Sequence, residues 1–309
     1  MSSRRIYRVL IIVLALAATG CASTPGEKKS DAEYKDLYNG DLQVAHAARQ
    51  KQPTAEEAIA SGDQALALGD TDRAMYEYVY ALELGGGDAH TLNKIGAIHS
   101  GLGNYQLAAR AFTLSLRLDP ENAAAHEGIG LLLLRDRRYA EAGKYLNAAL
   151  EADPQRWQSH NGLGMLSDLD GEHARAATHF RQALDNLSTA SSRTDRARVL
   201  NNLGYSTYMS GDPAGALPYF YQALDNHPEF DLAWQNIGLV HTMQGNYDRA
   251  LNAYMHVMSK PEAYNNLGFM CMVNKKYDKA ERYFRTAISL SPSYYAKAHE
   301  NLERLELLR

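Results

Sequence analysis

The sequence predicts an all-α protein, a solenoid of about seven helix–turn–helix repeats followed by a C-terminal capping helix. A glycine recurs along the 309-residue chain at spacings of 34, 34, 34, 40, 34 and 30 residues. An alanine follows each glycine by twelve residues, and a bulky residue follows each alanine by four. The glycines are Gly62, Gly96, Gly130, Gly164, Gly204, Gly238 and Gly268; the alanines are Ala74, Ala108, Ala142, Ala176, Ala216, Ala250 and Ala280; the bulky residues are Tyr78, Phe112, Leu146, Phe180, Phe220, Tyr254 and Phe284. A fixed period of this length is typical of stacked repeats.

These units resemble the tetratricopeptide repeat (TPR) family over about residues 55–292. The resemblance implies a right-handed superhelix in which the first helix of each unit lines a concave groove. Each unit buries its apolar face against its neighbours, so such an array has no single central core.

Charge and cysteine content exclude two classes of protein. The net charge is -4, and removal of residues 1–20 takes away Arg4, Arg5 and Arg8, which leaves -7. No run of Lys or Arg remains, so a basic footprint for nucleic acid is absent and nucleic acid is not an expected partner. The two cysteines, Cys21 and Cys271, lie at opposite ends of the chain and do not indicate a disulfide framework.

The N-terminus has the features of an export signal. Three arginines precede the apolar run 9–18, which is too short to span a bilayer permanently. The sequence Ala18-Thr19-Gly20-Cys21 resembles a bacterial lipobox, although leucine is commoner at the place of Ala18. The resemblance implies a signal peptide over 1–20 and a lipid anchor on Cys21, and Ala22 favours the outer membrane with the solenoid in the periplasm. The alternative is a short hydrophobic helix with a chance cysteine.

The remaining chain divides into three predicted regions. Residues 21–54 carry the lipidated cysteine, a Ser/Thr/Pro/Gly/Lys-rich tether, and a short helical or docking segment within 31–50. Thr54 and Glu57 predict a capping box at the first repeat. Residues 55–190 form a first TPR block of repeats 1–4, and residues 191–309 form a second block of repeats 5–7 with a capping helix over 294–309.

Three units depart from the repeat. Repeat 1 is degenerate, with Gly85-Gly86-Gly87 in place of the terminal proline. Repeat 4 carries six extra residues near 188–192, which predicts a longer loop or an extended helix and a bend between the two blocks. Repeat 6 is four residues short before Pro261, which predicts a truncated second helix or a tight turn.

The repeated residues have a predicted packing role. We expect the glycine and the alanine to lie where the two helices of a unit approach most closely, because a larger side chain there would overpack the interface. The bulky residue is expected to fill the gap between units. Cys271 is predicted to be a small buried hydrophobe.

No site for catalysis, cofactor or metal is predicted. The sequence contains no G-x-S-x-G, Walker loop or H-E-x-x-H motif. His126 and His160 occupy matching places in adjacent units, but two imidazoles without further ligands make a poor zinc site.

The predicted functional site is a partner-binding groove along the first helices of the C-terminal units. Its apolar members suit an apolar helix or an extended segment of a protein partner, because aromatic and methionine side chains adapt to such surfaces. They are Tyr205, Tyr208, Met209, Leu239, Met243, Phe269 and Met272. The alternative is that these side chains pack on one another or on residues 31–50.

Three asparagines recur at one place in successive units, at Asn202, Asn236 and Asn266. Identical amides one repeat apart predict a ladder that pairs with the backbone of a bound peptide. The alternative, weighed equally, is that they only satisfy local groups.

The last unit resembles TPR lipoproteins of the Tad (Flp, tight adherence) pilus assembly system. The residues that carry this resemblance are Glu262–Gly268, Ser291–Tyr295 and Glu300–Arg304. The resemblance implies an outer-membrane lipoprotein with a pilotin-like role, whose partners are a secretin or other pilus assembly components. Two other hypotheses stay open: an adaptor that recruits or regulates periplasmic cell-wall enzymes, and an envelope chaperone for exported subunits.

Overall fold

The computed structural model describes residue 34, residues 37–38, 52–188, 192–291, residue 293 and residues 295–308. The regular structure in this part of the chain is entirely helical, from α3 to α17. The predicted signal peptide, Cys21 and the tether over 22–30 lie outside the described residues. Among the helices described, none is both long enough and apolar enough to cross a membrane.

The helices alternate between the first and second members of seven units. The first helices are α3 (Ala55–Ala67), α5 (Ala89–Gly101), α7 (Ala123–Arg135), α9 (Trp157–Leu169), α11 (Arg193–Met209), α13 (Asp231–Met243) and α15 (Lys260–Val273). The second helices are α4 (Thr71–Glu83), α6 (Tyr105–Leu118), α8 (Tyr139–Ala152), α10 (His173–Asn186), α12 (Pro213–Asn226), α14 (Tyr247–Tyr254) and α16 (Tyr277–Leu290). The helix α17 (Ala296–Glu306) follows and packs on α16. The predicted all-α solenoid of seven repeats with a capping helix is confirmed.

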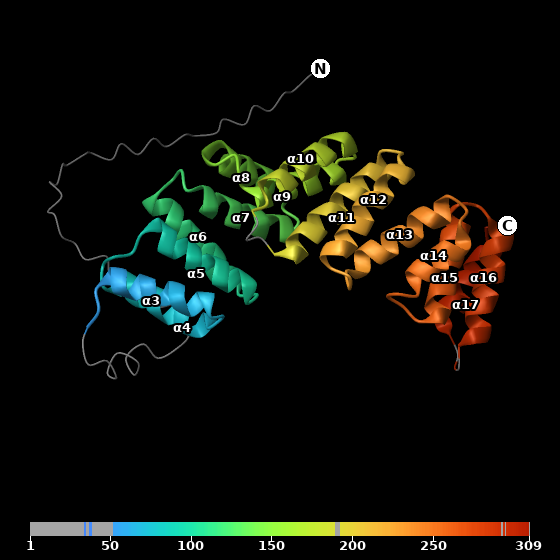
Figure 1. The fold of residues 1–309 in the computed structure, drawn as a ribbon, viewed down its shortest axis with the longest axis horizontal. Helices are drawn as coiled ribbons and strands as arrows, with labels where there is room; N and C mark the ends of the chain where they lie inside the picture. Colours follow the sequence, from blue (N-terminus) through green and yellow to red (C-terminus); the bar gives the residue numbers. More distant parts are fainter. Residues whose placement is uncertain are drawn as a thin grey trace, which may run out of the picture.

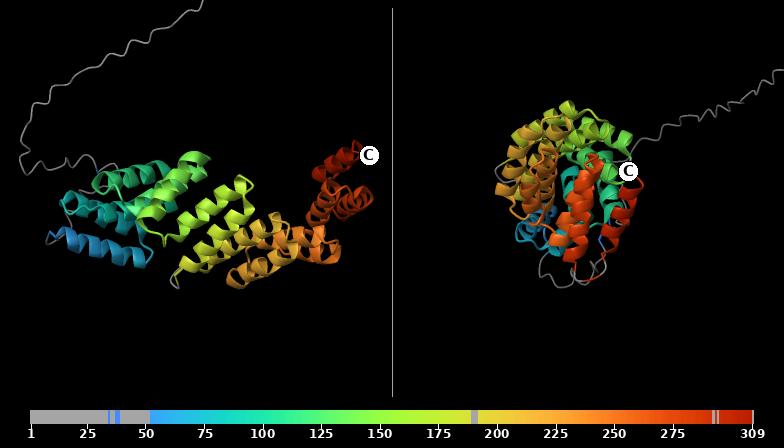
Figure 2. Two further views of the ribbon diagram at one scale, coloured as in Figure 1. Left: turned by 90° about the horizontal axis from the view of Figure 1, so that it is seen from above. Right: turned by 90° about the vertical axis from the view of Figure 1, so that its right-hand side faces the viewer.

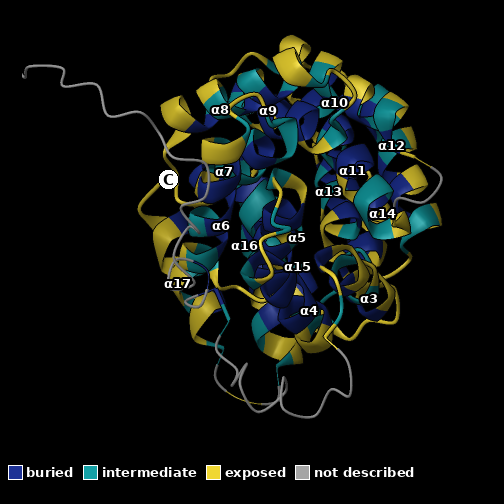
Figure 3. Ribbon diagram, turned by 90° about the vertical axis from the view of Figure 1, so that its left-hand side faces the viewer, coloured by how far each residue is buried: buried dark blue, intermediate teal, exposed yellow. Residues whose placement is uncertain are grey.

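The units stack from one end of an elongated molecule to the other (Figure 1). Viewed from its C-terminal end, the helices are arranged in a ring, because successive units wind about a common axis (Figure 2, right). Buried residues lie on the faces where helices pack together, and exposed residues lie mainly around the outside (Figure 3). The molecule is therefore a superhelix whose core is distributed along its length.

Each unit is held together by a bulky side chain of its second helix that covers the glycine of its first helix. A methyl group added at Gly96, Gly164 or Gly204 would lie 2.6, 2.6 or 2.7 Å from the nearest ring carbon of the phenylalanine in the same unit. The predicted need for a small residue is thus confirmed, but the close neighbour is a ring rather than the facing backbone. Phe112 also covers Gly128 of the next unit, so the same ring lies between units as expected.

A second contact joins successive units at their turns. The imidazole Nε2 of His126 lies 2.8 Å from the carbonyl oxygen of Pro120. His160 makes the same contact with Pro154 at 3.0 Å. The indole of Trp234 donates to the carbonyl of Pro228, also at 3.0 Å. These ring nitrogens therefore position each first helix against the turn before it. Within the described residues, no group of three or more His, Cys, Asp or Glu side chains could hold a metal ion.

The extra residues of repeat 4 are largely taken up by a longer helix. Helix α11 has 17 residues, whereas α9 and α13 have 13 each. One apolar cluster continues across this joint, with Phe180 and Leu187 on one side and Val199 and Leu203 on the other. The extended-helix alternative is confirmed, and the apolar core continues across the joint between the two predicted blocks.

The shortened repeat 6 has a truncated second helix, as one of the two alternatives predicts. Helix α14 has 8 residues, whereas α10, α12 and α16 have 14. It packs less extensively on the following first helix than the other second helices do. The joint between repeats 6 and 7 is therefore the most loosely packed in the array.

An N-terminal segment packs on the first repeat. Leu37 is 0% exposed and belongs to the apolar cluster of α3–α6. Its carbonyl oxygen lies 2.8 Å from Nε2 of His99, and the ring of Tyr38 packs edge-on against Tyr76. Helix α4 is buried at every residue from Ala74 to Leu82, unlike the corresponding helices of later units. The described residues of the predicted docking segment thus cover the solenoid's N-terminal end.

Cys271 is free and buried, which confirms its prediction as a small core residue. Burial raises the pKa of its thiol, so the protonated form is favoured.

We predict that Gly164→Ala destabilises the protein by about 1–3 kcal/mol, because the new methyl group would overlap the ring of Phe180. Urea unfolding followed by circular dichroism measures the change. The matched control is Gly143→Ala in α8, where the only neighbour of the new methyl group lies at 3.6 Å. That variant is expected to gain about 0.5–1 kcal/mol from helix propensity. Equal effects of the two substitutions would contradict the ring-on-glycine account.

We also predict that Leu37→Asp releases the N-terminal segment, because a carboxylate cannot stay in a fully buried apolar site without a partner. Tyr76 should then become accessible and react faster with tetranitromethane, as followed by peptide mass spectrometry. Leu68→Asp is the control, since Leu68 is already exposed. Unchanged protection of Tyr76 in the Leu37 variant would show that this contact does not cover α4.

Candidate protein-binding groove

The first helices of repeats 3–6 line an apolar hollow of about 540 Å³. Its walls come from α7, α9, α11 and α13, with Tyr139 of α8 and Phe180 of α10 completing it. We call this hollow the apolar groove. Its lining residues are Leu134, Tyr139, Met165, Asp168, Leu169, Phe180, Asn201, Asn202, Tyr205, Leu232 and Asn236.

Several large apolar side chains of this groove are exposed. Leu169 is 60% exposed and Leu232 is 54% exposed, and Met165 and Tyr205 are exposed as well. Single exposed apolar residues are ordinary, but a cluster on one concave face is typical of an interaction site. The groove therefore offers apolar surface that a partner can cover.

Amide side chains join the units along the same face. The amide of Asn202 donates to Oδ1 of Asn161 at 3.0 Å, and Asn236 donates to Oδ1 of Asn201 at 2.9 Å. The side-chain oxygens of Asn202 and Asn236 accept no hydrogen bond from the described part of the chain. Each of these two side-chain amides thus donates through its nitrogen to an asparagine of the neighbouring repeat. Its oxygen remains as a hydrogen-bond acceptor on a residue that lines the groove.

The structure divides the predicted site residues among several places. Asn202, Tyr205 and Asn236 line the apolar groove. Asn266 and Phe269 line a different hollow, whose walls come from α13, α15 and α17. The other predicted members lie outside both hollows: Met209 and Met243 are exposed at the ends of α11 and α13, and Leu239 is half-buried.

Two predicted members pack into the core. Met272 is 4% exposed and belongs to the cluster of α14–α17. Tyr208 is half-buried against the cluster of α11–α14, and burial raises the pKa of its phenol. Self-packing thus accounts for these two side chains, whereas Tyr205 beside Tyr208 remains exposed. Residues 34 and 37–38 pack at the opposite end of the solenoid and do not cover the groove.

Leu169 and Leu232 are not among the predicted groove residues, although both are among the most exposed apolar side chains that line the groove. They occupy the last and second places of their first helices. Because those places recur with the repeat period, the spacing of the repeats is the sequence feature that could have predicted these two residues. The predicted set extends one unit farther toward the C-terminus than the apolar groove does.

A serine, an aspartate and a histidine meet beside the groove. The Ser206 hydroxyl donates to Asp168 at 2.6 Å, and Nδ1 of His173 lies 2.9 Å from the same carboxylate oxygen. A nucleophilic serine needs the histidine between itself and the carboxylate. Here the carboxylate lies in the middle and Ser206 is buried, so this cluster joins α9, α10 and α11 rather than activating a hydroxyl.

A buried carboxylate holds the start of α9. Glu127 is 4% exposed and accepts the backbone N–H and the hydroxyl of Ser159, at 2.9 and 2.8 Å. It also pairs with Arg156 at 2.8 Å. Arg156, the residue before α9, makes no side-chain cap, so Glu127 of the previous unit supplies the negative charge that a helix N-terminus favours.

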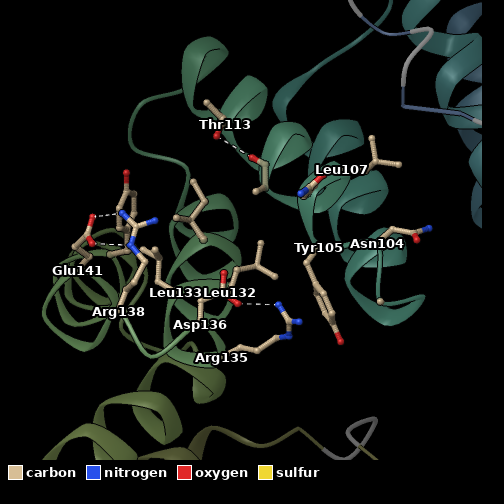
Figure 4. A pocket seen from close by; sticks show the side chains of 15 residues that line it. Asn104, Tyr105, Leu107, Thr113, Leu132, Leu133, Arg135, Asp136, Arg138 and Glu141 are labelled. Atoms are coloured by element: carbon tan, nitrogen blue, oxygen red, sulfur yellow. Dashed lines mark hydrogen bonds and ion pairs between the residues drawn. The ribbon is translucent and has the colours of Figure 1, made fainter.

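A further hollow of about 760 Å³ lies between α6 and α7–α8, and its charged side chains are paired with one another (Figure 4). The guanidinium of Arg135 lies over the ring of Tyr105, 3.3 Å from its centroid. Arg138 forms a two-point pair with Glu141, which lowers the pKa of that exposed carboxyl. With its charges internally matched, this hollow has no unpaired charge cluster to select an ionic ligand.

Family comparison agrees with the geometry. The tetratricopeptide repeat family matches residues 94–156, 144–191 and 195–257, and a second tetratricopeptide repeat profile matches residues 261–294. These matches cover more than half of the chain, which therefore belongs to the tetratricopeptide repeat family. TPR domains bind protein partners, so the fold and the groove together define a protein–protein interaction module.

Individual relatives are more distant. Photosystem I assembly protein Ycf3 of Dioscorea elephantipes is 30% identical over 22% of this chain and 50% of its own length. Ycf3 of Sorghum bicolor is 29% identical over the same shares. The chain thus spans about half the length of the curated relatives it matches.

Solved structures share the fold. The pilF protein of Pseudomonas aeruginosa has a TM-score of 0.52 at 17% identity, over 72% of this chain and 97% of that chain. A tetratricopeptide repeat protein of Parabacteroides merdae ATCC 43184 has a TM-score of 0.51 at 18% identity, over 82% and 98%.

We predict that Glu127→Ala destabilises the protein by roughly 3 kcal/mol, because it removes the cap of α9 and leaves Arg156 without its buried partner. Thermal and urea unfolding measure the loss. The control is Glu141→Ala, which removes a fully exposed ion pair and should leave the unfolding midpoint unchanged. A loss of stability no larger than that of the control would show that the buried pair does not hold α9.

Proposed function

We propose that this chain is a non-enzymatic scaffold that binds a protein partner in its apolar groove during assembly of a Tad (Flp) pilus or a related secretion machine. It acts as a lipoprotein anchored through Cys21 in the bacterial outer membrane, with the solenoid in the periplasm. Its partner is a secretin or another assembly component. The observation that carries the binding role is the cluster of exposed apolar side chains on the concave face.

The chemistry of the groove supports an apolar protein segment as the ligand. Leu169 and Leu232 supply branched apolar surface, while Met165 and Tyr205 supply adaptable and aromatic surface. Asp168 is the charged member of the lining, and its carboxylate already accepts two bonds from neighbouring side chains. A groove without free charge disfavours a charged tail and favours burial of apolar side chains.

Two sequence features support the envelope role. The lipobox-like Ala18–Cys21 supports the anchor, and the resemblance of residues 262–304 to Tad lipoproteins supports the assembly system. Several acyl chains on one residue give stable anchoring, since each buried methylene contributes about 0.8 kcal/mol.

The position of the first repeat is consistent with an anchored chain. Residues 22–33, which include the predicted tether over 22–30, can span at most about 40 Å, because a fully extended residue spans about 3.3–3.6 Å. The N-terminal segment that follows packs on α4 and α5. An anchored solenoid would thus keep its first repeat near the membrane while the apolar groove lies farther along the array.

The partner role is tested by photo-crosslinking in the native cells. A crosslinking amino acid in place of Leu169 or Tyr205 is expected to give an adduct with one secretin or pilus assembly protein, whereas the same residue at exposed Leu68 gives none. Leu232→Asp should reduce the groove adduct at least roughly tenfold, as for a residue central to an interface. An adduct with a cell-wall enzyme would favour the adaptor, and weak adducts with many proteins would favour the chaperone.

The anchor and the system have tests of their own. Cys21→Ser should abolish the lipid-dependent mass shift and release the chain from the membrane fraction. Deletion of the gene should reduce pilus display or secretin multimers. Unchanged membrane association of the serine variant would contradict the anchor, and unchanged pili together with unchanged secretin multimers would contradict the assembly role.

A further inference from the structure

The turn between the two helices of repeat 7 carries a cluster of lysines. Lys275 and Lys276 lie in the turn between α15 and α16, and Lys279 lies one helical turn farther along α16. Of the ion pairs within the described residues, none involves these three lysines. The corresponding turn of repeat 4 instead carries carboxylates, such as Asp170. Positive charge is therefore concentrated at this edge of the last repeat.

Lys275 adopts a backbone conformation that favours glycine. Its φ is 57°, in the left-handed region, whereas five other repeats have glycine at the same place. These glycines are Gly69, Gly103, Gly171, Gly211 and Gly245. A residue with a Cβ is strained in this region, so glycine would stabilise the turn more than lysine does. The strain indicates a role for the lysine side chain outside the fold.

Repeat 3 is the other exception, with Arg137 at a φ of 60°. The two other arginines of its turn are paired, Arg135 with Asp136 and Arg138 with Glu141. The lysines of repeat 7 have no such carboxylate partners among the described residues. A turn whose cations stay available to an anionic ligand is thus a feature of the last repeat.

Tyrosine rings hold the cations of this edge together. Nζ of Lys279 lies 4.2 Å from the centroid of the Tyr247 ring, and Nζ of Lys276 donates to the Tyr247 hydroxyl at 3.2 Å. The rings of Tyr247 and Tyr283 pack with centroids 6.0 Å apart, and the guanidinium of Arg282 lies 6.0 Å from the Tyr283 centroid. Cations are attracted to the faces of aromatic rings, so these contacts keep the charges grouped.

Exposed apolar side chains border the lysines. Val273 at the end of α15 is 57% exposed, and Met243 at the end of α13 is 41% exposed. The two turns are in contact, because Nδ2 of Asn274 lies 2.9 Å from the sulfur of Met243. We call the surface formed by these residues the basic edge; its members are Met243, Tyr247, Val273, Lys275, Lys276 and Lys279. It shares no residue with the lining of the apolar groove.

We propose that the basic edge is a contact site for an anionic phospholipid membrane. The lysine ammonium groups pair with headgroup phosphates, and Val273 and Met243 enter the boundary between headgroups and acyl chains. Tyr247 lies at the headgroup level, where tyrosine is enriched in membrane proteins. The inference goes beyond the proposed function and requires neither the lipid anchor nor a pilus partner.

The composition of the basic edge selects a lipid surface. Free phosphate or a nucleic acid would engage the lysines alone and leave the apolar side chains in water. A bilayer surface takes up both, because the methylene stems of lysines lie along apolar surface while their ammonium groups stay at the phosphates. Asp248 and Asp278 are exposed beside the edge and weaken the attraction, so the contact is reversible.

Such a contact orients the solenoid and does not replace an acyl anchor. Each basic residue near an anionic surface raises the partition coefficient about fivefold, so binding through three lysines is reversed by salt and dilution. A chain without its anchor is therefore still released from membranes on washing. Repeats 1 and 7 lie at opposite ends of the elongated molecule, so an anchored chain would meet the membrane at both ends and lie along it (Figure 1).

The test is vesicle sedimentation of the chain from residue 21 onward with Cys21→Ser, which keeps the whole described structure and excludes an acyl group. The protein should sediment with vesicles rich in phosphatidylglycerol and stay in solution with vesicles of phosphatidylcholine alone. Higher ionic strength should weaken the binding, because salt screens exposed charges.

Matched lysine variants locate the binding. Lys275→Gln/Lys279→Gln should lower the partition coefficient at least roughly tenfold, since two charges are lost. Lys144→Gln/Lys297→Gln removes two exposed lysines elsewhere, with the same change in net charge, and should leave the coefficient unchanged.

Two single variants separate membrane contact from a structural role. Lys275→Gly should lower the partition coefficient and yet raise the urea midpoint, because glycine relieves the left-handed backbone. Val273→Ser should also lower the coefficient, whereas Leu68→Ser, at another exposed leucine, should not.

Equal binding to the two kinds of vesicle, or an equal loss in the two lysine pairs, would overturn the membrane contact. So would unchanged binding of the Val273 variant, because the apolar side chains then do not enter the bilayer. A crosslinking amino acid at Val273 that gave an adduct with one acidic protein in native cells would replace the membrane with that protein. The groove is judged separately by its adduct from Leu169, so either proposal can fail without the other.

Discussion

The contact between a bulky side chain of each second helix and the glycine of its first helix is the constraint on which the whole array depends. It sets how closely the two helices approach, because any side chain at Gly164 or Gly204 would occupy the space of the ring. The same ring or leucine also meets the next unit, as Phe112 meets Gly128. One repeated contact therefore sets both the shape of a unit and its stacking.

Polar contacts then fix how the first helix of each unit is positioned against the preceding unit, which apolar packing alone does not determine. Ring nitrogens of His126, His160 and Trp234 reach the proline carbonyls of the preceding turns. Asparagine pairs join first helices across successive units, and Glu127 holds the start of α9. The asparagine pairs join successive units along the face that also carries the apolar groove.

The units that depart from the repeat carry the individual features of this molecule. The first unit is covered by Leu37 and Tyr38, which replace the missing preceding neighbour. The long α11 absorbs an insertion without breaking the core. The short α14 packs less extensively on the following first helix than the other second helices do. Each feature follows either from the position of a unit at the end of the array or from a change in the length of a helix. The contacts between bulky side chains and glycines continue in the units on either side.

The sequence by itself determined the helical class, the number of units, the capping helix and the small buried roles of the glycines and Cys271, because a strict period links local pattern directly to packing. It also identified Asn202, Tyr205 and Asn236, which line the groove. Only the tertiary structure decided that Met272 is buried and that Leu169 and Leu232 are exposed, because exposure depends on how far each helix is rotated and overlapped by its neighbours. The same dependence on neighbouring units decided that no hydrogen bond joins Gln235 to Asn266 within the described residues, whereas the asparagines on either side form pairs.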